Sequence, residues 1–307
     1  LFYQKNNMTE ALQNRGLRPD TKQPKVTTVE IDGKSLELIK VNDAVTMVNI
    51  EKLLPVGWRN RLVASGLYLS EPVEFEGGAI ATSKEDGSFV TSYSVVDGSK
   101  IKNNIPWLYD AWKGPIAKVV AAVAGEEVVP DDGMDEQGRE FGININVMEL
   151  ETQKSGYEWH VDHNPLTALF AGTDIQDGDG GELLHRLAID DSSEGQPENN
   201  NEVFETRIKA GWVYIFRGNE WDHKVNPLNS RGSTAIRMTV PMDYNTLGFN
   251  KERPEGLSGI FGGHQIETNK PAPVVELFSK SNGQNPEGDP DPESPDPVTP
   301  NQKRMAS

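Results

Sequence analysis

Two histidines and one aspartate in the second half of the chain have the residue types and spacing of a metal site. His160 and Asp162 lie two residues apart in the segment G-Y-E-W-H-V-D-H-N-P, whose aromatic and β-branched residues favour a strand. Side chains alternate along a strand, so residues two apart point to the same face. His223 follows the distant apolar run G-W-V-Y-I-F-R-G-N-E-W-D-H. Two imidazoles and one carboxylate form a facial triad that suits non-haem iron(II) and leaves positions open for a co-substrate and dioxygen.

The composition limits both the metal ligands and the partners of the protein. Cysteine is absent, which excludes disulfides and thiolate metal sites and leaves histidines and carboxylates as the strong ligands. The 47 acidic residues outnumber the 30 basic ones, and the formal net charge is −17. This charge disfavours nucleic acid and anionic membranes as partners and favours a neutral or cationic substrate. No long apolar run or charged leader is present, so we expect no membrane span, no export and a cytoplasmic location.

Short strand-like segments dominate the chain after residue 140. In Phe141–Leu150 apolar residues alternate with amides, so Ile143, Ile145 and Val147 are predicted on a packed face, and Asn144 and Asn146 on a face toward a polar cavity. Further strands are predicted over residues 159–162, 166–171, 182–187, 203–209, 212–216 and 235–242. Many short strands with turns between them, and no alternating helices, favour an antiparallel jelly roll or barrel.

The segment before residue 141 has the patterns of a scaffold for this core. Two strand-like runs flank the turn signal Asp32-Gly33, which predicts a β-hairpin over residues 26–41. A helix through Leu54 is predicted with Asn42 or Asp43 as its N-cap, and a further helix over Trp58–Ser65. The longest helix is predicted over Ile105–Ala124, where apolar residues recur with a period of about 3.6 residues.

These patterns divide the chain into a scaffold over residues 1–140, a catalytic core over 141–250, a C-terminal extension over 251–280 and a tail over 281–307. Within the core, residues 189–202 lack apolar anchors, so we expect a mobile loop there, either a lid beside the metal site or an insertion without a role. In the tail, prolines and acidic residues recur almost without apolar residues, which predicts disorder. Such a tail either increases solubility or binds partners.

The order of the motifs resembles that of the Fe(II)/2-oxoglutarate-dependent dioxygenase superfamily. After His-x-Asp come the paired glycines Gly180-Gly181, then His223 behind an apolar strand, and then two arginines near the start of a final strand. The resemblance covers roughly Phe141 to Tyr244. It implies a mainly β fold with flanking helices around a double-stranded β-helix, which is a cupin-like jelly roll. It also implies that His160, Asp162 and His223 bind iron(II).

The resemblance further implies a basic residue, on the strand after the distal histidine, that pairs with the C5 carboxylate of 2-oxoglutarate. A guanidinium suits this role because it donates two parallel hydrogen bonds to a carboxylate. Arg237 shares a strand face with Thr239, whereas Arg231 lies among turn residues. We therefore favour Arg237, with Thr239 as a second contact, and keep Arg231 as the alternative. A salt bridge at the surface or at an interface is the structural alternative for Arg237.

Other residues near the triad have both a functional and a structural interpretation. Asn144 and Asn146 either donate to 2-oxoglutarate or are satisfied structural amides. The aromatic residues that flank the ligands either line the substrate pocket or pack at the barrel mouth, and they are Tyr157, Trp159 and Trp221.

The remaining polar residues beside the ligands are interpreted by their position in the sequence. His163 and Asn164 directly follow the ligand pair and can orient it. We expect that His185 and His264 are not ligands, because a facial triad needs only two imidazoles.

The activity that the resemblance implies is that of an oxidoreductase using Fe(II), 2-oxoglutarate and dioxygen. Such a hydroxylase oxidises an unactivated C–H bond and releases succinate and CO2. Related halogenases have a small residue in place of Asp162, so the carboxylate favours hydroxylation, desaturation or ring closure over halogenation. No extended basic or aromatic groove is visible, which favours a small-molecule substrate over a side chain of a protein or peptide.

Two other classes of function remain open from the sequence. One is a different cupin-like metalloenzyme, an isomerase or a hydrolase, that holds manganese or zinc with the same residues. The other is a non-catalytic jelly-roll binding protein in which the triad is structural. Dependence of turnover on 2-oxoglutarate distinguishes the first alternative, and failure to take up Fe(II) supports the second.

Overall fold

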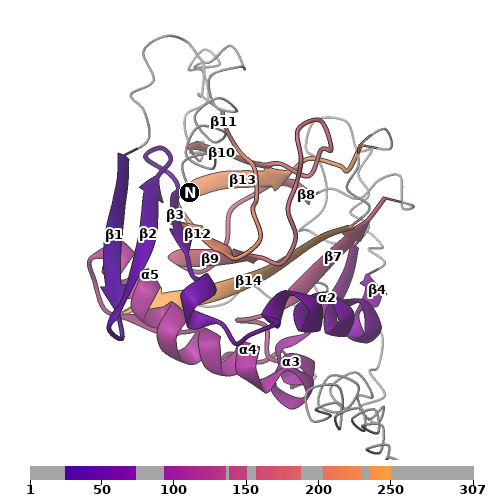
Figure 1. The fold of residues 1–307 in the computed structure, drawn as a ribbon, viewed down its shortest axis with the longest axis horizontal. Helices are drawn as coiled ribbons and strands as arrows, with labels where there is room; N and C mark the ends of the chain where they lie inside the picture. Colours follow the sequence, from indigo (N-terminus) through magenta and orange to yellow (C-terminus); the bar gives the residue numbers. More distant parts are fainter. Residues whose placement is uncertain are drawn as a thin grey trace, which may run out of the picture.

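The described part of the chain forms two facing antiparallel β-sheets, with helices along the outer side of the larger one (Figure 1). The computed structural model describes residues 25–73, 93–135, 138–150, 157–187, 203–229, 232 and 236–249. This architecture confirms the predicted mainly β jelly-roll fold with flanking helices. Several predictions lie outside the described residues: Arg231, His264, the Tyr157 side chain and residues 1–24, 189–202 and 251–307.

The larger sheet has ten strands in the order β1-β2-β3-β12-β9-β14-β7-β5-β4, and β6 pairs with β14. Its strands are β1 (Lys25–Ile31), β2 (Lys34–Lys40), β3 (Thr46–Asn49), β4 (Glu71–Val73), β5 (Tyr93–Val96), β6 (Val128–Pro130), β7 (Ile145–Glu149), β9 (Leu166–Ala171), β12 (Trp212–Phe216) and β14 (Ile236–Thr246). The smaller sheet has the order β11-β10-β13-β8. It consists of β8 (Tyr157–His160), β10 (Leu183–Leu187), β11 (Phe204–Thr206) and β13 (Trp221–Val225).

The helices cover the face of the larger sheet that points away from the smaller sheet (Figure 1). They are η1 (Glu51–Leu53), α2 (Trp58–Leu69), α3 (Gly98–Asn104), α4 (Pro106–Ala111), the π-helical turn η2 (Trp112–Ile116) and α5 (Ala117–Ala124). The predicted helix over 105–124 is therefore present, but it widens where Pro115 lacks the backbone N–H for a regular turn. Among the described residues, no helix has the length and apolarity to span a bilayer.

Several strands agree closely with the sequence patterns. The hairpin of β1 and β2 turns at Asp32 and Gly33, whose φ angles of 49° and 73° give the left-handed backbone that such a turn needs. The predicted strands over 166–171 and 212–216 coincide with β9 and β12. Both strands are buried along their whole length, so their continuous apolar runs identify them.

The predicted helix from residue 43 to Leu54 is wrong. Asn42 was interpreted as part of a helix N-cap, but its Oδ1 accepts from the backbone N–H groups of Ala44 and Val45, each at 2.8 Å. This turn leads into β3, which lies between β2 and β12 and pairs with both. Pairing on both edges overrides the local helical signal.

The strand predicted over 159–162 also differs, because β8 ends at His160 and Asp162 lies in the loop beyond it. Strand β13 and helix α3 were not predicted at all.

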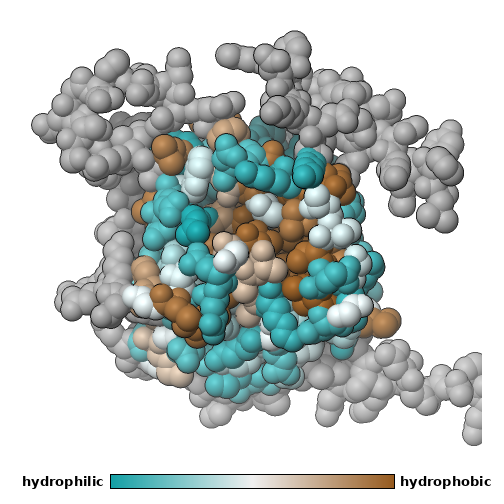
Figure 2. All heavy atoms as spheres, turned by 90° about the vertical axis from the view of Figure 1, so that its left-hand side faces the viewer, coloured by the Kyte–Doolittle hydropathy of each residue, from teal (hydrophilic) through white to brown (hydrophobic). Residues whose placement is uncertain are grey.

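Between the two sheets lies a second core cluster, which we call the inner cluster. It contains residues of both sheets, among them Met148, Leu169, Leu183, Tyr214, Phe216 and Val225. On the surface at the left of Figure 1, apolar side chains gather in the middle of the face and hydrophilic ones surround them (Figure 2). The inner cluster forms the surroundings of the predicted metal ligands, whose strands belong to the smaller sheet.

Candidate metal centre

The two histidines of the triad are brought together by the pairing of β8 with β13. His160 and His223 are direct partners in the antiparallel register, so their side chains point to the same face. Their ring centroids are 4.1 Å apart. Val225, two residues further along β13, packs in the inner cluster, which places both imidazoles on the face toward the larger sheet.

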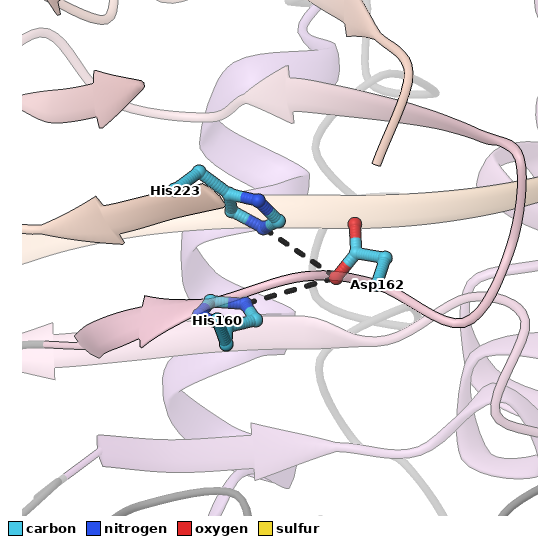
Figure 3. Close-up of side chains that lie close together, drawn as sticks. All are labelled: His160, Asp162 and His223. Atoms are coloured by element: carbon cyan, nitrogen blue, oxygen red, sulfur yellow. Dashed lines mark ion pairs between the residues drawn. The ribbon is translucent and has the colours of Figure 1, made fainter. Parts of the chain in front are cut away.

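Asp162 reaches the histidines from the loop after β8. Its backbone N–H donates to the Gly218 carbonyl at 2.8 Å, which fixes the loop against the segment after β12. Thr167 Oγ1 on β9 donates to Asp162 Oδ2. The other oxygen, Oδ1, lies 3.7 Å from His160 Nε2 and 3.4 Å from His223 Nε2 (Figure 3). The carboxylate oxygen Oδ1 therefore faces both imidazoles.

The triad has the donor set and the spacing for one metal ion. Its ligand atoms all lie within 4.8 Å of one another, and in the described part of the chain no other group of three such residues does so. Two ligands that each lie about 2.1 Å from an ion are at most about 4.2 Å apart, so one ion can bridge Asp162 Oδ1 and each imidazole nitrogen. Two imidazoles and one carboxylate leave further coordination positions open in an octahedral ion.

The charges of the triad stabilise one another in the metal-free protein. Burial alone would raise the pKa of Asp162, but His223, then His160 and the Thr167 hydroxyl outweigh it and hold this pKa well below its usual range. Burial alone would lower the pKa of His223, but the Asp162 carboxylate outweighs it and raises this pKa above 6.5. In the metal-free protein, the positive charge of protonated His223 therefore balances the Asp162 carboxylate, as the charge of a bound metal ion would.

A third imidazole lies beside the triad without belonging to it. His185 on β10 is the direct partner of His223, and the two rings stack at a centroid distance of 5.9 Å. The side chain is completely buried, which lowers the pKa of His185 to about 3 and keeps the ring neutral. His185 does not belong to the group of ligand atoms that the triad forms.

Arg237 on β14 of the larger sheet is buried, and its side chain points into the space between the two sheets, as the triad histidines do from the smaller sheet. Its Nε donates to the Gly181 carbonyl at 2.9 Å and its Nη1 to Thr239 Oγ1 at 3.2 Å. Its Nη2 is buried and has no hydrogen-bond partner among the described residues. The buried Glu182 carboxylate acts on the guanidinium through its charge, but no hydrogen bond joins the two among the described residues. Burial lowers the pKa of Arg237 to about 10, so the group remains charged. The arginine is 1% exposed, which excludes the alternative of a surface salt bridge.

Asn146 lies on β7, the strand next to that of Arg237, and Asn144 directly precedes β7. Asn146 is paired with Thr239, and Met148 of the inner cluster is paired with Arg237. The Oδ1 atoms of both asparagines are buried without a partner among the described residues. Buried polar atoms normally have partners, and the described residues supply none for these two oxygens.

The two tryptophans that flank the ligands lie on opposite faces of the smaller sheet. Trp159 points away from the metal ligands, because it packs between Arg186 (4.2 Å) and Lys224 (5.1 Å) on the outer face of the smaller sheet. It is therefore not part of the interior. Trp221 lies on the inner face two residues before His223 and packs against the inner cluster and Phe204. It is the flanking tryptophan that the structure brings close to the triad.

The two residues after Asp162 hold the loop rather than the ligands. Asn164 is buried and donates to Asp131 Oδ2 at 2.6 Å and to Asn245 Oδ1 at 2.9 Å. The His163 ring packs edge-on against Phe249. Both therefore anchor the turn that carries Asp162, which is an indirect form of the predicted orienting role.

Two residues that position the carboxylate ligand, Thr167 and Gly218, were not predicted from the sequence. Thr167 lies in an apolar run, where a single hydroxyl carries no signal of its own, and its contact with Asp162 depends on how the loop folds back over β9. Gly218 follows the apolar strand as F-R-G, which reads as an ordinary turn.

Comparison with solved structures finds similar folds at low identity. An oxidoreductase of the 2OG-Fe(II) oxygenase family from Burkholderia pseudomallei is 15% identical, with 66% of this chain and 85% of that chain covered and a TM-score of 0.44. AviO1 from Streptomyces viridochromogenes is 16% identical (69% and 93% covered, TM-score 0.48). SnoN, a non-heme alpha-ketoglutarate-dependent epimerase from nogalamycin biosynthesis, is 17% identical (67% and 83% covered, TM-score 0.44).

No protein-family model matches the chain, and no curated protein matches its sequence. TM-scores of 0.44 to 0.48 are too low to carry a function from those proteins to this one. The function of this chain therefore rests on the residues of the site.

Proposed function

We propose that this protein is an Fe(II)- and 2-oxoglutarate-dependent oxygenase that hydroxylates an unactivated C–H bond of a small molecule. The observation that carries the proposal is the combination of the His160, Asp162 and His223 triad with the Arg237 guanidinium inside one fold. Among the described residues no carboxylate hydrogen-bonds this guanidinium, and its Nη2 has no partner. A buried, charged donor of this kind calls for an anionic ligand, since leaving it unpaired is costly. A metal site without an anionic co-substrate would not need this guanidinium.

The two ends of the proposed co-substrate site are connected by β10. Arg237 contacts the Gly181 carbonyl just before this strand begins, and His185, further along it, lies opposite His223. A dicarboxylic 2-oxo acid fits this arrangement, with one carboxylate on Arg237 and Thr239 and its 2-oxo carboxylate end at the metal. The planar fork of Arg237 can offer its unpartnered Nη2 to that distal carboxylate.

Iron(II), together with 2-oxoglutarate and dioxygen, supplies an oxidant that converts R–H to R–OH while 2-oxoglutarate becomes succinate and CO2. The chain's own residues hold and shield this chemistry. Asp162 is kept in place by Gly218 and Thr167, so the ligand geometry does not depend on the metal. Leu183, Phe216 and Val225 surround the site with apolar side chains that exclude water.

The presence of Asp162 favours hydroxylation over halogenation. A carboxylate at this position occupies the coordination site that a halide would need, and its Oδ1 is oriented toward both imidazoles. Desaturation and ring closure use the same ligand set, so product analysis distinguishes them from hydroxylation.

The substrate is proposed to approach past Trp221. Leu187 pairs with Trp221 at the end of β10, four residues beyond Leu183, and Leu187 is 56% exposed. Phe204 packs against the same indole. This apolar edge, in a protein with a net charge of −17, suits a neutral or cationic small molecule with an apolar portion.

Succinate release from 2-oxoglutarate in the presence of Fe(II) and dioxygen tests the proposal without knowledge of the substrate. We expect slow metal-dependent release that Arg237→Ala reduces at least about tenfold, as expected for the loss of hydrogen bonds to a charged group. Arg186→Ala is the matched control, because Arg186 lies on the outer face of the smaller sheet against Trp159. If the metal binds but 2-oxoglutarate is never consumed, alone or with candidate substrates, the protein is a different kind of metalloenzyme.

A further inference from the structure

His185 is a buried polar residue that the triad and Arg237 leave unexplained. Its side chain is 0% exposed, and neither Nδ1 nor Nε2 has a hydrogen-bond partner among the described residues. An imidazole carries at least one N–H in every protonation state. A buried donor without an acceptor costs about 1 to 3 kcal/mol, so a histidine placed for packing alone would be unfavourable compared with an apolar residue.

The register of β10 directs this imidazole into the space between the sheets. Leu183, two residues earlier on the same strand, packs in the inner cluster, so His185 points to the same side. The ring stacks on His223 and meets Phe216 edge-on at a centroid distance of 4.8 Å. His185 therefore lies at the level of the metal ligands, although it is not one of the described group of ligand atoms.

The distance along β10 separates His185 from the Arg237 end of the site. Arg237 Nε donates to Gly181, four residues before His185, and a strand rises about 3.3 Å per residue. Arg237 therefore lies just before the start of β10, whereas His185 lies at its middle. An anion that is held by Arg237 and also chelates the metal presents its chelating end, not its distal end, to His185.

We propose that His185 binds the co-substrate, and that its ring N–H donates a hydrogen bond to the carboxylate of 2-oxoglutarate at the metal-chelating end. This inference rests on the proposed function and assigns a residue to the second carboxylate of the co-substrate. The bond satisfies the buried donor and adds a charge-assisted contact at an oxygen that does not bind the metal. Together, Arg237 and His185 select 2-oxo acids that carry a carboxylate at each end.

Titration of 2-oxoglutarate into anaerobic, Fe(II)-loaded protein tests this role, with the visible band of the chelate as the readout. His185→Phe keeps the ring volume and removes the N–H, and His185→Gln retains an N–H donor. We expect His185→Phe to raise the Kd for 2-oxoglutarate about tenfold or more, the effect of losing one hydrogen bond to a charged group, and His185→Gln to recover part of the loss. The Kd for Fe(II) should stay within about threefold, since His185 is not a ligand.

Phe216→Leu is the matched control, because it disturbs the packing of the same ring cluster without removing a polar atom. If Phe216→Leu raises the Kd for 2-oxoglutarate as much as His185→Phe, the effect is one of packing and the inference is wrong. An unchanged Kd in His185→Phe, beside a wild-type protein that forms the chelate, also overturns the inference and leaves the proposed function intact. A wild-type protein that binds Fe(II) but forms no chelate overturns both.

Discussion

Gly218 leaves open the space that the Asp162 carboxylate fills. A Cβ at position 218 would lie 2.5 Å from Asp162 Oδ2 and 2.6 Å from Thr167 Oγ1, closer than real Cβ atoms approach other atoms. The Gly218 carbonyl also accepts the Asp162 backbone N–H at 2.8 Å. The segment after β12 thus positions the carboxylate ligand from the side opposite the metal.

Gly218→Ala should weaken metal binding without changing any ligand. The added methyl group pushes the Asp162 carboxylate away from the two imidazoles, and we expect the Kd for Fe(II) to rise about tenfold, in the range seen when groups that orient ligands are altered. Anaerobic Fe(II) titration measures the effect. Gly114→Ala is the control, since a Cβ there meets no atom within 4 Å. Equal Fe(II) affinity in the two variants would show that Asp162 is not held by this contact.

Metal affinity should depend on pH through His223. The Asp162 carboxylate raises the pKa of His223 above 6.5, so this imidazole is protonated at and below that pH in the metal-free protein. A metal needs the neutral ring, and binding must therefore release a proton. Below the raised pKa we expect the apparent Kd to increase about tenfold for each unit of pH, and above it to level off. Titrations with a divalent metal at several pH values, with proton release measured in weak buffer, check this slope.

The metal-free protein should lose stability in mild acid because of His185. Burial lowers the pKa of His185 to about 3, whereas the unfolded chain takes up a proton near 6.5. Because the unfolded state binds more protons in this window, the free energy of unfolding should fall by about 1.4 kcal/mol per pH unit as the pH drops from 6.5 toward 3.

Denaturant unfolding of wild type and His185→Phe at pH 6.5, 5.5 and 4.5 isolates this contribution. The Asp162 contribution, from a lowered pKa, is lost only as the pH falls below 3.8, and the His223 contribution is lost only as the pH rises above 6.5. A stability difference between the two proteins that does not change with pH in this window would contradict the buried, neutral state of His185.

Replacing Arg237 should separate co-substrate binding from folding. Arg237→Met removes a buried charge that has no carboxylate partner among the described residues, so the free energy of unfolding of the metal-free protein should change by less than about 2 kcal/mol. In wild type loaded with a divalent metal, 2-oxoglutarate at about 100 times its Kd should add about 2.7 kcal/mol, and in Arg237→Met this gain should vanish. A loss of more than about 3 kcal/mol in the absence of ligands would identify Arg237 as a structural residue instead.

The sequence predicted strands and ligands where a residue pattern repeats. It did not predict features that depend on which strands pair and in which register. Continuous apolar runs were sufficient to predict β9 and β12, and the spacing of His160, Asp162 and His223 was sufficient to predict the triad. Residue order does not give the register of β10 against β13, which sets His185 opposite His223. The side of the sheet on which Trp159 lies does follow from the sequence, because alternation along β8 places it on the face opposite to the neighbouring His160.

The loop positions illustrate the same limit. Asn42 has the same side chain whether it caps a helix or closes a turn before a strand, and only the partners of β3 decide between the two. Arg237 was favoured over Arg231 because it alternates with Thr239; Arg237 is fully buried, and Arg231 lies outside the described residues. That Arg237 Nη2 has no hydrogen-bond partner among the described residues, in contrast, could be recognised only from the structure.

The most direct test of the proposed function is an anaerobic titration of the metal-free protein with Fe(II) and then with 2-oxoglutarate, followed by visible absorption. The proposed function predicts a weak charge-transfer band that appears only when both are present and that is absent in His160→Ala. Fe(II) binding without this band at saturating 2-oxoglutarate, or the same band in His160→Ala, would contradict it.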